Sequence, residues 1–297
     1  NLPLESSFLI QWIELEPNDV VVNEVLFNPF SGGVDFVELY NRSAKRIDAG
    51  KLVLAGRDRN LTLRQHVSLK TVNKVIEPGG YIALTINRES VLSFYISYCP
   101  ECIYNLPSMP AFNNDEGWAV IMDDSQNILD EFHYTENMHH RLLHNVKGVS
   151  LERVNPDLPA THPGNWQSAS SDIGFATPGY QNSQYQTGQA FKADVMVEPQ
   201  AFSPNGDGYN DELLIHYKTP GPGWVANVWV FDTVGRTIMQ LLKNQLLATE
   251  GTIVWNGEDE TGSRIPTGPY ILFFEMYDLN GNLERFKNAI FITDRYE

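Results

Sequence analysis

Oxygen-bearing side chains recur at short spacing in one glycine-rich stretch, residues 205–211, which reads Asn-Gly-Asp-Gly-Tyr-Asn-Asp. Asn205, Asp207 and Asp211 supply carboxylate and amide oxygens, and calcium takes about six to eight oxygen ligands in flexible geometry. The stretch is not an EF-hand, because its sixth position is not Gly and its twelfth carries no carboxylate. The alternative is a turn in which the Asx side chains bond their own backbone and the glycines take positive φ. We expect either calcium at Asn205, Asp207 and Asp211 or that turn.

The two cysteines, Cys99 and Cys102, stand in the order Tyr-Cys-Pro-Glu-Cys. A zinc site needs four ligands, and the sequence has no second pair at this spacing. A thioredoxin-like role would need the pair at the start of a helix in a βαβ unit. We therefore expect a disulfide between Cys99 and Cys102, with free thiols as the alternative and metal or redox chemistry ranked last. The histidines that could complete a zinc site follow no common spacing: His133, His139, His140 and His144.

The sequence lacks the short motifs of common enzymes. It contains no G-x-S-x-G, H-E-x-x-H, P-loop or G-x-G-x-x-G. His139 and His140 stand near Asp130 and Glu131, but adjacent residues diverge on either a strand or a helix. We interpret both histidines as loop or surface residues and expect no catalytic residues.

Charge and hydropathy narrow the class of partner. The chain has 297 residues, of which 21 are Lys or Arg and 37 are Asp or Glu, so its net charge is −16. Without a basic patch, such a chain does not bind nucleic acid or an anionic membrane surface. The apolar stretch at residues 8–13 is far shorter than the ~20 residues of a membrane helix and lacks the flanks of a signal peptide. Since the sequence begins at Asn1 without Met, we read it as a processed protein or an excised fragment.

Alternation with period two and β-branched runs dominate the sequence, which predicts many short strands separated by turns. Helical character is confined to residues 88–98 and 139–145. The stretch 181–189 is polar, uncharged and without periodicity, which is the composition of a linker. The fold class is therefore all-β, with two immunoglobulin-like β-sandwiches in tandem, the first carrying a partly helical insertion. The predicted units are an N-terminal strand or tail of an upstream region at 1–18, a first sandwich at 19–184, a polar linker at 185–191 and a second sandwich at 192–297.

The first block resembles the lamin tail domain over about residues 19–184. The resemblance rests on Val-Asn-Glu-Val-Leu-Phe-Asn-Pro at 22–29, Asp-Phe-Val-Glu-Leu-Tyr-Asn at 35–41 and three closing motifs in order, at 150–154, 165–169 and 176–183. It implies an immunoglobulin-like fold and a binding or scaffolding role, and the segment at about 57–116 looks like the insertion of bacterial versions. On an architectural interpretation of these motifs, Glu38 and Arg153 form an internal ion pair and Trp166 fills a core.

The second block resembles the immunoglobulin-like domains of flagellar hook-capping proteins and of gliding-associated and type IX secretion-associated surface proteins. The resemblance covers about residues 193–293 and rests on Phe-Ser-Pro-Asn-Gly-Asp-Gly-Tyr-Asn-Asp at 202–211 and ordered motifs at 230–236, 254–259 and 261–270. The last residues, 291–297, do not show the Gly-started strand ending in Leu-Leu-Arg that is usual in such signals. A type IX signal role is therefore left open at this point.

Together the two resemblances imply a non-enzymatic structural or binding module, at the surface of or secreted by a Gram-negative bacterium, with the periplasm as a further option. Its role would be adhesion, assembly or presentation of other domains, and its partners would be protein domains or surface components. One alternative is the accessory C-terminal region of a larger secreted nuclease, protease or glycanase. The other is a carbohydrate-binding module, for which Trp224, Trp229 and Tyr217 are the only aromatic cluster.

Overall fold

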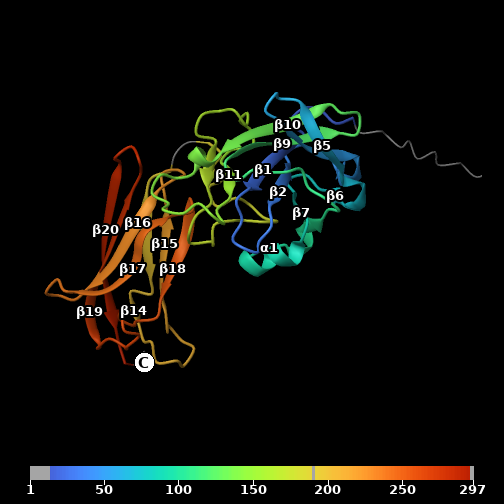
Figure 1. Ribbon diagram of the computed structural model, residues 1–297. Helices are drawn as coiled ribbons and strands as arrows, with labels where there is room; N and C mark the ends of the chain where they lie inside the picture. The colour runs from blue at the N-terminus through green and yellow to red at the C-terminus, as the bar shows by residue number, and fades with distance from the viewer. Residues whose placement is uncertain (1–13, 189–190, 295–297) are drawn as a thin grey trace, which may run out of the picture.

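The computed structural model describes residues 14–188 and 191–294, so the predicted tail at 1–18 lies mostly outside the described residues. Strands dominate, as the alternation predicts, and they form two sandwiches that follow each other along the chain (Figure 1). This confirms the predicted all-β fold class.

The first sandwich consists of a six-stranded and a four-stranded sheet. All pairings are antiparallel except β7 with β8. The six-stranded sheet has the order β12 (Trp166–Ser168), β11 (Leu151–Arg153), β1 (Val20–Leu26), β2 (Phe36–Asn41), β7 (Tyr81–Thr85) and β8 (Ile103–Asn105). The four-stranded sheet has the order β10 (Ile128–Thr135), β9 (Glu116–Asp123), β4 (Leu52–Arg57) and β5 (Leu63–Ser68).

Short elements complete the first sandwich. They are the strand pair β3 (Ile47–Asp48) and β6 (Val75–Ile76), helix α1 (Arg88–Phe94), and the 3-10 turns η1 (Ala49–Lys51), η2 (Leu69–Thr71), η3 (Pro100–Cys102) and η4 (Glu136–Met138). The predicted insertion is thus partly helical, but it also supplies β5, β7 and β8 to the two sheets. The main core lies between the sheets and includes Trp166, whose ring stacks on Phe132 at 3.4 Å between centroids.

The second sandwich consists of a three-stranded and a five-stranded sheet around a separate core. The three-stranded sheet has the order β13 (Asp194–Glu198), β15 (Leu213–Lys218) and β18 (Glu250–Trp255). The five-stranded sheet has the order β14 (Ala201–Phe202), β20 (Leu283–Ile292), β19 (Gly268–Tyr277), β16 (Val225–Phe231) and β17 (Thr237–Leu246).

Two expectations about exposed or helical segments are wrong. Residues 139–145 form turns instead of a helix: the Leu143 N–H closes a turn on the His140 carbonyl at 3.0 Å, while the His140 N–H is held by Ser168 Oγ at 2.9 Å. The aromatic cluster suggested for carbohydrate does not form an exposed platform, since Tyr217 and Trp224 are 2 % and 5 % exposed in the second core.

The outer face of the six-stranded sheet is also covered, and this places the candidate site. Helix α1 and residues around Ala176 pack there against Leu26, Phe36 and Ala83. All seven residues of β1 are therefore buried, although a strand of a two-layer sandwich usually alternates buried with exposed positions.

Candidate functional site at the junction of the sandwiches

Three glutamates face one another in a row across three adjacent strands. Glu24 on β1 lies opposite Glu38 on β2 and opposite Glu152 on β11. All three side chains lie on the outer face of the six-stranded sheet, and all three residues are fully buried. Like charges directly opposite each other destabilise a sheet, and a buried carboxylate needs hydrogen bonds. This glutamate row therefore requires a polar cover.

Residues 176–187, which we call the junction segment, supply that cover. The backbone N–H groups of Thr177, Gly179 and Gln184 donate to Glu24, Glu38 and Glu152, at 2.9, 2.6 and 2.9 Å. The hydroxyl of Thr177 lies 3.1 Å from Glu24 Oε2 and 3.0 Å from Glu152 Oε1. Each glutamate thus fixes one point of the segment to the first sandwich.

Neighbouring amides and hydroxyls satisfy the rest of the cluster. Asn23 donates to Glu38 Oε1 at 2.9 Å, and Ser183 donates to Glu152 Oε2 at 2.8 Å. Asn182 donates to the carbonyls of Asn23 and Arg153 at 3.0 and 2.8 Å. No Lys, Arg or His within the described residues forms an ion pair with the glutamate row.

Because the three glutamates are buried without a cationic partner among the described residues, their pKa values are raised. Burial, and then the charge of Glu152, raises the pKa of Glu24 to about 8. Burial raises the pKa of Glu152 to about 7. Burial, and then the charge of Glu24, raises the pKa of Glu38 well above its usual value.

The cysteine pair supports the same segment from the far side. Cys99 and Cys102 are joined by a disulfide in the turn at η3, with their Cα atoms 5.3 Å apart. A Cβ placed on Gly179 would lie 2.9 Å from the Cys99 carbonyl oxygen, and Ser97 Oγ donates to the Pro178 carbonyl at 2.6 Å. The disulfide turn therefore lies directly behind the point at which Gly179 donates to Glu38.

The junction segment also bonds to the second sandwich. The side chain of Gln184 donates to the Leu247 carbonyl at 2.8 Å and accepts from the Gly223 N–H at 2.9 Å. The Thr249 N–H donates to the Ser183 carbonyl at 2.9 Å. The predicted linker at 185–191 thus follows residues that bond to both sandwiches, and residues 189–190 of it lie outside the described ones.

Residues just before the segment add contacts to the same region. The Ser171 N–H donates to the Leu246 carbonyl at 2.9 Å. The Asp172 carboxylate accepts from the Tyr217 hydroxyl and from the Ala248 N–H. The end of β17 and the turn after it are therefore held by several residues of the first block.

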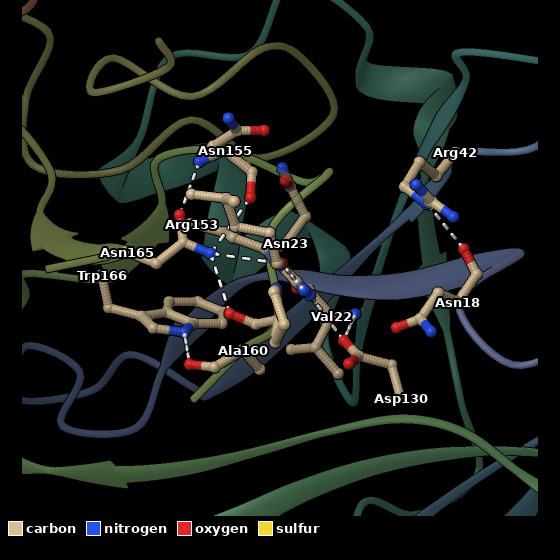
Figure 2. A network of polar contacts seen from close by, with 12 residues as sticks. Asn18, Val22, Asn23, Arg42, Asp130, Arg153, Asn155, Ala160, Asn165 and Trp166 are labelled. Atoms are coloured by element: carbon tan, nitrogen blue, oxygen red, sulfur yellow. Dashed lines mark hydrogen bonds and ion pairs between the residues drawn. The ribbon is translucent and has the colours of Figure 1, made fainter. Parts of the chain in front are cut away.

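A second polar network fixes β11 from the inner side of the sheet (Figure 2). Arg153 donates to Asp130 Oδ2 at 2.6 Å, to the Val22 carbonyl at 3.1 Å and to the Leu158 carbonyl at 2.7 Å. Burial raises the pKa of Asp130, although the Arg153 guanidinium acts in the opposite direction. The predicted ion pair between Glu38 and Arg153 is wrong, because their side chains lie on opposite faces of the sheet.

The two adjacent histidines are in a loop, as expected, but they are not at the surface. His139 and His140 are 6 % and 5 % exposed, and His139 Nδ1 lies 2.9 Å from Ser168 Oγ. Burial lowers the pKa of His139 to about 4 and also lowers that of His140. The Asp130 carboxylate accepts a hydrogen bond from Arg153. It therefore does not form a reactive pair with either histidine.

In the stretch 205–211 the side chains bond the loop's own backbone. Asp211 accepts from the N–H groups of Gly206 and Gly208 at 2.6 and 2.7 Å, and these bonds lower its pKa. Asn205 Oδ1 accepts from the Asp207 N–H at 2.8 Å, and both glycines have positive φ. Within the described residues, no group of three or more His, Cys, Asp or Glu has the arrangement of a metal site. These contacts are those of the turn, and calcium stays a prediction.

Comparison with known families concerns the second sandwich. The model of the CHU_C type IX secretion signal domain matches residues 196–292. The match supports the resemblance to type IX secretion-associated domains, and it implies secretion to the cell surface or the extracellular space, as predicted. It also supports a non-catalytic secreted or surface module. No described helix is long and apolar enough to cross a membrane.

Several solved structures are similar at low identity. FlgD from P. aeruginosa shares 17 % identity over 35 % of this chain and 78 % of its own, with a TM-score of 0.25. PorU from Porphyromonas gingivalis shares 12 % over 96 % of this chain and 19 % of its own, with a TM-score of 0.28. PorZ from the same organism shares 16 % over 91 % of this chain and 38 % of its own, with a TM-score of 0.25. No curated protein matches the sequence.

Proposed function

We propose that the chain is a surface module in which a lamin tail-like sandwich, residues 19–184, is held rigidly on a type IX secretion signal domain, residues 192–297. The signal domain directs the chain to the cell surface, and the first sandwich serves adhesion, assembly or presentation of other domains. The partners are protein domains or surface components.

One residue carries the rigid part of this proposal. The backbone N–H of Gln184 donates to Glu152 of the first sandwich, and its side chain bonds Leu247 and Gly223 of the second. Gln184 is fully buried, so these bonds do not compete with water. A module that must hold a fixed orientation under load outside the cell benefits from such a residue.

Secretion is tested on the full chain carrying an epitope tag before Asn1. The tagged chain is expressed in a bacterium with a type IX apparatus and in a strain that lacks its outer-membrane translocon. We expect antibody binding to intact cells of the first strain and periplasmic accumulation in the second. The same location in both strains would contradict the signal role.

We also propose calcium at Asn205, Asp207 and Asp211, whose oxygens keep free lone pairs beside the turn hydrogen bonds. Asp207→Ala is expected to lower the melting temperature of the second sandwich by several degrees more in calcium than in chelator. Asp259→Ala is the matched control, because Asp259 also accepts from its own turn, at Thr261 and Ser263. If the unaltered chain melted at the same temperature in calcium and in chelator, the calcium proposal would be contradicted, and residues 205–211 would form a turn without a metal.

A further inference from the structure

The hydrogen count around Thr177 does not balance when both neighbouring glutamates are ionised. A threonine hydroxyl has one hydrogen, but Thr177 Oγ1 lies within 3.1 Å of Glu24 Oε2 and 3.0 Å of Glu152 Oε1. One of these contacts can be a hydrogen bond from Thr177. The other can be a hydrogen bond only when the carboxyl group itself carries the hydrogen.

Among the described residues, no cation pairs with Glu24 or Glu152, and the other hydrogen bonds to them leave this count unchanged. Glu24 Oε1 already accepts from Ser150 Oγ and the Thr177 N–H. Glu152 Oε2 already accepts from Ser183 Oγ and the Gln184 N–H. Two adjacent buried carboxylates cannot both ionise cheaply without a cation, so one retains a proton.

The groups that face the row from its neighbours are neutral. They are Tyr81 on β7, Tyr95 at the end of α1 and Tyr180 on the junction segment. Among the described contacts, the titrating neighbour is the third glutamate, Glu38, which lies opposite Glu24 and whose pKa is also raised. The Tyr95 hydroxyl donates to the Gly148 carbonyl at 3.0 Å. Arg153 and Asp130 lie on the opposite face of the sheet and are bonded to each other.

We propose that Glu24 and Glu152 form a proton-binding site bridged by the Thr177 hydroxyl, and that the bound proton holds the junction segment on the first sandwich. This inference rests on the proposed rigid junction. Loss of the proton leaves two charges facing each other behind Thr177. The segment then separates from the sheet, and the bonds that its Gln184 makes to the second sandwich lose their fixed position.

The direction of the pH dependence follows from the raised pKa values of Glu24 and Glu152. In the unfolded chain the glutamates lose their protons near pH 4.5, whereas the folded pair retains one until pH 7 to 8. A raised folded pKa means that the folded state binds more protons in this window, so stability falls as pH rises through it. Below about pH 4.5 and above about pH 8 this contribution is constant.

The test compares the full chain with Glu24→Gln, which keeps the shape of the side chain and supplies an N–H toward Thr177 without a titrating proton. Melting temperature and amide protection of residues 177–184, corrected for the intrinsic exchange rate, are measured at pH 6 and pH 9. In the unaltered chain we expect a melting temperature at least about 5 °C lower at pH 9, and protection about tenfold lower. Glu24→Gln should reduce both differences by half or more.

Glu152→Gln is a second variant with the same expectation, and Glu116→Gln is the control, since the Glu116 side chain is 63 % exposed. An unaltered chain whose protection at 177–184 is the same at both pH values would overturn the proposal. So would a pH dependence that both variants leave unchanged. Secretion is read separately by the tagged chain, so a failure of the proton site and a failure of the signal role are distinguishable.

Discussion

Arg153→Met is expected to lower the free energy of unfolding of the first sandwich by about 3–5 kcal/mol. The substitution removes the cationic partner that Asp130 has among the described residues, and it leaves that carboxylate in a buried position, 8 % exposed. It also leaves the carbonyls of Val22 and Leu158 without their donor. Thermal unfolding followed by circular dichroism should show a melting temperature lower by about 10 °C.

The matched control is Arg64→Met, because Arg64 also forms an ion pair, with Asp58, but its side chain is 62 % exposed. An exposed pair contributes about 0–1 kcal/mol, so this variant should unfold almost as the unaltered chain does. Combining Arg153→Met with Asp130→Leu should restore part of the loss, since no buried charge then lacks a partner. Equal effects of Arg153→Met and Arg64→Met would contradict the assignment.

Gly179→Ala is expected to destabilise the chain by about 2–4 kcal/mol through backbone strain and crowding. Gly179 has a φ of 93°, and its added Cβ would lie 2.9 Å from the Cys99 carbonyl oxygen and 3.4 Å from Cys102 Cβ. The disulfide fixes the positions of Cys99 and Cys102. The substituted residue must therefore move away from them and toward the glutamate row. Chemical denaturation of the full chain measures the loss.

Gly174→Ala separates the two causes. Gly174 has a similar φ of 84°, but a Cβ there would have no atom within 4 Å. It should therefore cost only the left-handed strain, about 1–2 kcal/mol. If both variants lost the same stability, contact between the disulfide turn and the junction segment would play no part.

The strands and the sandwich class follow from local patterns, which is why they could be predicted from the sequence. Alternation at residues 35–40 gives β2 within one residue, and the alternation at 225–231 gives β16 with the same bounds. Three-residue strands such as β11 and β12 are too short for a periodic signal, and they form because neighbouring strands offer free backbone groups.

The junction could not be predicted, because its residues look ordinary in the sequence. Glu24, Glu38 and Glu152 stand at positions where an exposed face would carry polar residues. Their burial depends on a segment about 150 residues from β1 in the chain. Only the register of β1 with β2 and β11 brings the three glutamates together. A usable signal was the motif at 176–183, whose Thr177 and Ser183 hydroxyls bond the glutamates and whose Asn182 donates to the adjacent Arg153 carbonyl.

Backbone amide exchange across residues 177–187 of the full chain, at pH 6 and followed by mass spectrometry, tests the rigid junction most directly. The N–H groups of Thr177, Gly179 and Gln184 donate to buried carboxylates, and that of Gln186 donates to the Val154 carbonyl. The account predicts that this segment exchanges as slowly as β16, an interior strand of the second sandwich. Exchange as fast as that of an exposed turn, while β1 and β16 remain protected, would contradict it.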